Sequence, residues 1–192
     1  MKKNKFWILF GLMILLSLSS QLLAQANRIL TLAPTAQASS IGNVMLPMMN
    51  PARNLFDKDH FSFSRVNWMT NIVDDMSYNF INFDRGQYGL NVLFFNYGEQ
   101  NQSDEFGIIQ NQFTPLSAVY SFSYARKVDK YNLGLDAKLI THNLHTQNAK
   151  GLVFGVGGYF PKVYKDLDLD VMVRNFGFAP KFGSWKSELP TS

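Results

Sequence analysis

The sequence predicts an all-β fold: an antiparallel up-and-down transmembrane β-barrel, of which about seven strands are present as an open half-barrel. Three observations lead to this prediction. The chain opens with an export signal, stretches of roughly ten residues then alternate apolar and polar side chains, and none of the 192 residues is cysteine. Charged residues make up only 17% of the chain and aromatic residues 15%, which favours a membrane wall over a soluble surface.

Residues 1–26 have the three parts of a secretory signal peptide. A lysine-rich start precedes the apolar run Phe6–Leu16, and small residues at Ala24 and Ala26 offer two cleavage positions. A retained anchor is the alternative, but the apolar run is shorter than the ~20 residues of a membrane-spanning helix. Removal of the segment takes away three lysines and leaves fifteen basic against fourteen acidic residues, so no nucleic-acid partner is expected.

Residues 27–57 follow the signal and differ from the rest of the chain. They are rich in Ala, Ser, Pro and Met and show little strand alternation. The segment is therefore predicted to be either a linker or a plug that folds against the barrel wall. Residues 58–192 form the predicted β-barrel domain.

The clearest predicted strand is Tyr131–Thr141, because successive side chains of a strand point to opposite faces. Its apolar and polar residues separate cleanly under this rule. The apolar face carries Tyr131, Leu133, Leu135, Ala137 and Leu139, and the polar face carries Asn132, Gly134, Asp136, Lys138 and His142.

Six further strands are predicted by the same alternation. They lie at about 61–68, 76–83, 88–94, 116–124, 152–156 and 167–174. The first two change phase near residues 65–68 and 81–83, which predicts β-bulges there. Gly155 to Gly158 interrupt the fifth, and glycine inside a strand lets a bulky neighbour or a plug approach closely.

The predicted connections alternate in length. Residues 84–87, 127–130 and 161–166 are short, whereas 98–115, 143–150 and 176–188 are longer. Outer-membrane barrels pair short periplasmic turns with longer outer loops in this way. A soluble periplasmic β-sandwich acting as a binding module is the alternative, since its strands also alternate, with the apolar side facing inward.

The strand count carries a further expectation. Single-chain bacterial barrels have at least eight strands and an even number, and an unpaired edge in hydrocarbon costs several kcal/mol for each backbone group. Leu189 to Ser192 look like the first residues of an eighth strand. The chain is therefore expected to be incomplete, with exposed first and seventh edges.

Four short motifs occur in order along the mature chain. They are the small-residue segment Ala36–Gly42, the tripeptide Asn50-Pro51-Ala52, Asn96-Tyr97-Gly98, and Asn175-Phe176-Gly177 followed by Leu189-Pro190. In order and spacing they resemble the PorV/PorQ family of outer-membrane proteins, relatives of the FadL-type long-chain fatty-acid channels.

The resemblance implies a barrel of about fourteen strands in the outer membrane of a Gram-negative bacterium, with its N-terminal segment in or near the lumen. Family members serve type IX secretion, so the implied partners are outer-membrane lipid, secreted cargo proteins and other components of that system. The alternative function is a FadL-like channel for hydrophobic small molecules.

Two departures from the family concern the N-terminal segment. The stretch from Gly42 to Asn50 is shorter than in most relatives, and Arg53 follows Asn-Pro-Ala where glycine is usual. For Asn50-Pro51, a turn that bends the chain into its first strand is as well supported as contact with cargo.

Charged residues on the polar sides of the strands are the candidate lumen residues. Asp168 and Asp170 are expected to pair with Arg174 or Lys138 on neighbouring strands, and such a polar lumen suits an acyl chain poorly. The set comprises Asp136, Lys138, Asp168, Asp170 and Arg174.

Enzymatic and metal chemistry are not predicted. His142 and His145 are three apart and face opposite sides of a strand, so they cannot share an ion unless the chain turns there. Asp166, Asp168 and Asp170 have calcium-loop spacing but lack its later glycine and glutamate. No Gly-x-Ser-x-Gly elbow occurs, and no cofactor is expected.

Overall fold

The computed structural model describes residues 28–32, 49–56, 59–68, 71, 75–183, 185–186 and 189. The predicted signal segment, with Ala24 and Ala26, and the Ala36–Gly42 motif lie outside the described residues. Two short 3-10 helices belong to the N-terminal segment, η1 (Arg28–Thr31) and η2 (Pro51–Leu55).

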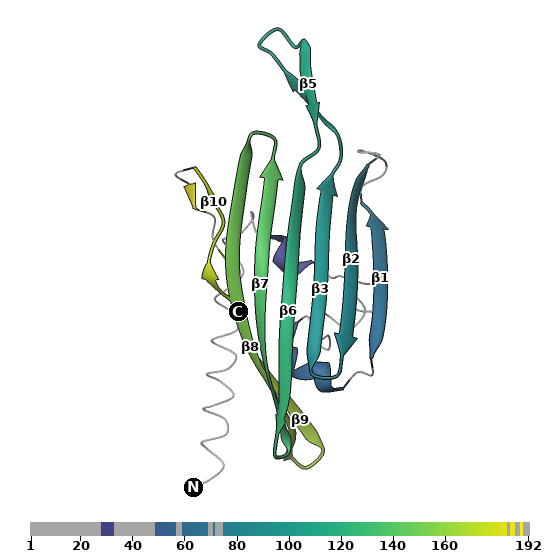
Figure 1. The fold of residues 1–192 in the computed structure, drawn as a ribbon, viewed down its shortest axis with the longest axis vertical. Coiled ribbons are helices and arrows are strands. Elements are labelled where there is room, and N and C mark those ends of the chain that lie inside the picture. Colours follow the sequence, from purple (N-terminus) through teal and green to yellow (C-terminus); the bar gives the residue numbers. More distant parts are fainter. Residues whose placement is uncertain are drawn as a thin grey trace.

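Seven antiparallel strands form the main sheet, in the order β1-β2-β3-β6-β7-β8-β9 (Figure 1). Among the described residues β1 and β9 each pair with one neighbour only, so the sheet is open. The predicted all-β, antiparallel, seven-stranded open half-barrel is confirmed. The strands are β1 (His60–Asn67), β2 (Met76–Arg85), β3 (Tyr88–Tyr97), β6 (Leu116–Val128), β7 (Tyr131–Leu144), β8 (Gln147–Tyr164) and β9 (Leu167–Phe178).

The two ends of the sheet differ in their connections. At one end, called the turn end, two-residue turns at 86–87, 129–130 and 165–166 join consecutive strands. At the opposite end, called the hairpin end, β3 and β6 are joined by 98–115, which contains the hairpin β4 (Gln100–Ser103) and β5 (Ile109–Phe113). This hairpin projects beyond the sheet (Figure 1).

The prediction of a long loop at residues 143–150 is wrong. β7 and β8 stay paired up to Leu144 and Gln147, and only His145 and Thr146 form the turn. His145 has a φ of 55°, the left-handed conformation that lets antiparallel strands reverse in two residues. The segment predicted to follow the last strand, 176–188, is also shorter than expected, because β9 continues to Phe178. The hairpin β10 (Lys181–Phe182) and β11 (Trp185–Lys186) follows.

The two faces of the sheet have opposite character. The inner face is the one that η1 and η2 contact (Figure 1), and the outer face is the other. On β7, Leu133 and Leu135 of the outer face are 44% and 58% exposed, whereas Asp136 and Lys138 of the inner face are 6% and 4% exposed. Apolar side chains are thus exposed and polar ones buried, the reverse of a soluble β-sandwich.

The inner face is divided along the strands. Towards the hairpin end it is apolar: Phe80, Leu93, Val119 and Ile140 are successive register partners across four strands. Ile29 and Leu30 of η1 join this cluster, and both are buried. Towards the turn end the next register row is polar, and it comprises Asn82, Asn91, Ser121 and Lys138.

The bulges predicted in the first two strands are wrong, because the register of β1 with β2 and of β2 with β3 has no shift. The irregular sequence pattern has another cause. Tyr78, Phe80, Asn82 and Asp84 all lie on the inner face, which changes from apolar to polar along β2.

Register shifts occur instead between β8 and β9. Arg174 and Asn175 both lie opposite the single residue Gly155, and Asn175 has a φ of 59°. Val173 and Phe176 on either side are exposed, whereas Asn175 is 1% exposed. This bulge turns two consecutive polar side chains inward. Among the described residues, no helix has the length and apolar character needed to cross a membrane.

Candidate functional site: the seat of the N-terminal segment

The N-terminal segment crosses the inner face near the turn end as the short helix η2. Asn50 caps this helix, because its Oδ1 accepts the Ala52 N–H at 3.0 Å and its carbonyl accepts the Arg53 N–H at 3.0 Å. Pro51 occupies the first helical position, where its missing N–H is not needed. The predicted turn into the first strand at Asn50-Pro51 is therefore a capped helical turn bound to the sheet wall.

A row of small residues makes room for this helix. Ala125, Gly134 and Gly157 are register partners on β6, β7 and β8. A Cβ added at Gly134 would overlap the backbone of Pro51 and Ala52, and one at Gly157 would overlap the Asn50 side chain. Only glycine permits so close an approach, so these positions form a fitted seat. The expectation that the glycines at 155–158 admit a close neighbour is met at Gly157.

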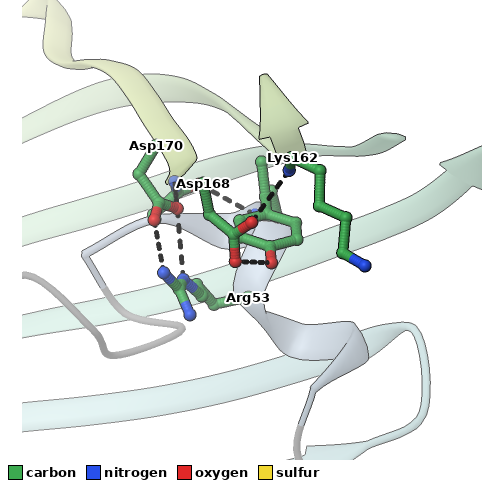
Figure 2. Close-up of polar contacts among 7 residues, drawn as sticks. Arg53, Lys162, Asp168 and Asp170 are labelled. Carbon is green, nitrogen blue, oxygen red and sulfur yellow. Dashed lines mark hydrogen bonds and ion pairs between the residues drawn. The ribbon is translucent and has the colours of Figure 1, made fainter. Parts of the chain in front are cut away.

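Asp170 of β9 fastens the helix to the last strand (Figure 2). It accepts hydrogen bonds from Asn50 Nδ2 at 3.0 Å and from Arg53 Nε at 3.1 Å, and Arg53 Nη2 forms an ion pair with its other oxygen. The Arg53 and Asp170 side chains are 14% and 32% exposed. A two-bond arginine–carboxylate contact is geometrically specific and stronger than a neutral hydrogen bond.

Aromatic rings enclose the arginine. The guanidinium lies 4.9 Å from the centre of the Phe56 ring and 5.0 Å from that of Tyr159, and these two rings pack edge to face at 4.6 Å. Tyr159 in turn donates to Asp168, which also accepts the Lys162 N–H at 2.8 Å (Figure 2). The contacts hold the planar cation between a carboxylate and two π faces.

Asn54, on the opposite side of η2, reaches the middle of the sheet. Its Nδ2 donates to Ser123 Oγ of β6 at 2.8 Å, and Asn54 is fully buried. Next to Ser123, Asn82 Nδ2 donates to Asn91 Oδ1 at 2.7 Å and to Asp84 Oδ2 at 2.9 Å. The helix thus spans the inner wall from β6 to β9.

The structure places the five predicted lumen charges in three surroundings. Asp170 and Asp168 belong to the seat, whereas Asp136 and Lys138 lie farther along the wall and form an ion pair at 3.4 Å. Arg174 is half-buried and donates to Met49 Sδ at 3.0 Å, just before η2. The expected pairing of Asp168 and Asp170 with Arg174 or Lys138 is wrong. Asp168 instead contacts Tyr159 and the Lys162 N–H, and Asp170 contacts Asn50 and Arg53.

His142 and His145, which were considered as metal ligands, have different surroundings. His142 is buried on the inner face with Nδ1 2.6 Å from Ser117 Oγ, and His145 lies in the β7–β8 turn against the Phe113 ring at 4.5 Å. Within the described part of the chain, no three His, Asp or Glu residues gather as a metal site.

Sequence reasoning singled out Asn50-Pro51-Ala52 but missed most of the seat. Arg53 was noted only as a departure from the family pattern, yet it makes the ion pair to Asp170. Gly134 and Tyr159 carried no local signal, because their roles depend on a segment about 80 to 110 residues earlier in the chain. The arrangement binds the chain's own N-terminal segment through hydrogen bonds, an ion pair and a close fit to glycine.

No protein-family model matches the chain, and no curated protein matches it either.

Proposed function

We propose that the protein is an outer-membrane β-barrel protein of PorV/PorQ type that assists type IX secretion or the surface attachment of secreted cargo. The observation that carries the membrane part is the sidedness of the sheet: apolar side chains are exposed on the outer face, while the buried polar face holds the N-terminal segment. In water this arrangement is unfavourable, whereas lipid suits the outer face.

Strand length and aromatic placement support the same assignment. β6 to β9 have 12 to 18 residues each, more than the roughly 9–11 residues that cross a bilayer as a tilted strand. Outer-face rings pair near the turn end, with Tyr88 and Tyr124 centred 5.3 Å apart and Tyr131 and Phe160 also 5.3 Å apart. Aromatic girdles of this kind mark the membrane boundary of outer-membrane barrels.

The short connections suggest the orientation. Periplasmic turns are short and outer loops are longer, so the turn end faces the periplasm and the β4–β5 hairpin lies outside the cell. The seat of η2 then lies on the lumen wall near the periplasm. A segment bound to the wall at that level would narrow a closed lumen, which favours a role in binding and handing over proteins above free diffusion of solutes.

Fractionation and a secretion assay test this proposal. The full chain, tagged at its C-terminus, should remain in the outer membrane after a salt wash, and its deletion should deplete surface-attached secreted proteins. The outcome is compared with a strain in which the gene has been restored. Recovery in the soluble periplasm would favour the β-sandwich instead. Membrane location without any change in surface proteins would contradict the secretion role alone.

The alternative channel for hydrophobic small molecules has one observation of its own. The inner face towards the hairpin end is apolar, with Leu93, Val119 and Ile140 no more than 1% exposed. The charged residues that make the lumen unsuited to an acyl chain lie towards the turn end, so this apolar part of the face is what supports the channel alternative. If the protein is a channel, Leu93→Asn should weaken binding of a labelled long-chain fatty acid, whereas Leu90→Ala on the outer face of the same strand should not.

A further inference from the structure

We infer that the tip of the β4–β5 hairpin is a preformed docking element for a protein partner that offers an apolar pocket bordered by lysine or arginine. The tip, residues 104–109, is at the far end of a projection from the sheet (Figure 1). The inference uses the proposed function only to place this tip outside the cell.

Three large apolar side chains gather at the tip. Phe106 is 80% exposed, Ile108 61% and Ile109 56%. The flanking strands carry only amide and other polar side chains between Gln100 and Ser103 and between Gln110 and Gln112, so the apolar group is confined to the tip. An exposed aromatic with aliphatic neighbours is the composition of an interface anchor.

Asp104 holds the tip in one conformation. Its Oδ1 accepts the N–H groups of Phe106 and Ile108, both at 2.9 Å, and its Oδ2 accepts Gln110 Nε2 at 2.9 Å. Gly107, with a φ of 78°, donates its N–H to the Asp104 carbonyl at 3.0 Å. A side chain presented on an ordered turn loses less entropy on binding than one on a flexible loop.

The base of the hairpin is held as well. Phe113 packs against the His145 ring, and the Gly98 N–H is accepted by Asn96 Oδ1 at 2.8 Å. The projection therefore has organised contacts at both ends.

Charge indicates which partner fits the tip. Residues 98–115 contain Glu99, Asp104 and Glu105 and no lysine, arginine or histidine. Complementary charge guides and orients protein association, so a basic rim suits this tip. A phosphate-bearing lipid surface would repel it, which makes lipid the less favoured occupant.

Site-specific cross-linking in intact cells of the source bacterium tests the inference. A photoreactive amino acid replaces Ile108 in the full chain, and in a control chain it replaces Val163, which is exposed at the turn end. We expect a protein adduct from position 108 and not from 163, with lysine or arginine beside apolar residues in the cross-linked peptide. Phe106→Ala should reduce the adduct tenfold or more.

Two variants of Asp104 separate tip geometry from folding. Asp104→Asn retains an oxygen for the two backbone N–H groups and should keep most of the adduct, whereas Asp104→Ala should lose it. An adduct with lipid, equal adducts from both positions, an adduct that survives Phe106→Ala, or no adduct would each overturn the inference. Fractionation of the same cells keeps the two proposals distinct: outer-membrane location without the adduct contradicts only this inference, and an adduct in a soluble protein contradicts only the proposed membrane location.

Discussion

At the scale of single residues, one arginine changes what a helical turn can do. Asn50 caps η2 and Pro51 begins it. The attachment of the helix to β9 depends on Arg53, the third residue of η2, whose side chain reaches Asp170. A glycine there could not supply a cation. Arg53 therefore adds a side-chain fastening to a backbone that already fits the glycine seat.

The fit of the seat predicts the effect of one methyl group. Gly134→Ala should displace η2, because the new Cβ overlaps backbone atoms that have no rotamer with which to move aside. We expect the free energy of unfolding to fall by about 1–3 kcal/mol. Trypsin should also cleave faster after Arg53 in the detergent-folded protein. Ala137→Val, on the outer face of the same strand, is the control. Unchanged cleavage in Gly134→Ala would refute the seat.

The ion pair predicts coupling between two distant positions. Arg53→Ala and Asp170→Ala should each lower the unfolding free energy by about 1–2 kcal/mol, because each removes a charge-assisted contact at a partly exposed pair. The double variant should lose little more than either single variant. Denaturant titration of the refolded protein measures this coupling, and strict additivity would mean that the pair contributes nothing.

At the scale of elements, the β4–β5 hairpin is ordered by one carboxylate rather than by burial. The backbone N–H of Ile108 lowers the pKa of Asp104 most, and the contacts with Gln110 and Phe106 lower it further. A carboxyl group with a lowered pKa in the folded state stabilises the fold fully above its ordinary pKa. That contribution disappears as the pH falls through the lowered value.

The hairpin tip should therefore loosen only in acid. We expect the Phe106 and Ile108 amide resonances to hold their positions from neutral pH to about pH 4–5, and to shift below that range as Asp104 is protonated. Asp104→Asn keeps an uncharged acceptor and should show a flat profile. A shift centred near neutral pH would assign the ordering to another group.

At the scale of the whole molecule, the apolar outer face is the property on which the proposed membrane location depends. Leu135 lies on this face of β7 and is 58% exposed, so a charge placed there reports whether lipid or water covers the face. If it faces lipid near the bilayer centre, Leu135→Arg should destabilise the inserted protein by about 2–4 kcal/mol, whereas Val163→Arg near the turn end should cost about 0–1 kcal/mol.

Folding into lipid vesicles at increasing denaturant, followed by the gel shift between folded and unfolded forms, measures both variants. An arginine at position 135 that leaves stability unchanged or improves solubility would indicate that water covers the outer face. Equal losses at positions 135 and 163 would contradict a dependence on membrane depth.

The alternation of side chains along the chain was enough to predict the seven strands of the main sheet, because the strand period of two is a local property of the backbone. It did not predict the short strands β4, β5, β10 and β11, which lie in segments expected to be loops. It placed Leu133 and Leu135 on the face opposite Asp136 and Lys138, and the number of strands predicted an open sheet. It also suggested bulges in β1 and β2 that do not exist. A change from apolar Phe80 to polar Asn82 along one face resembles a phase shift when only the sequence is available.

Tertiary structure alone decided where the N-terminal segment binds and which charges meet. Arg53 and Asp170 are 117 positions apart, and Gly134 has no room for a side chain because a helix from far earlier in the chain passes over it. The tight turn at His145 and the ordered tip at Asp104 likewise depend on strand pairing and on contacts across the turn. Alternation indicates which face of a strand a residue occupies, because it depends on the local backbone alone. It does not indicate which residue of another strand or helix will be the partner, because that depends on how distant segments pack.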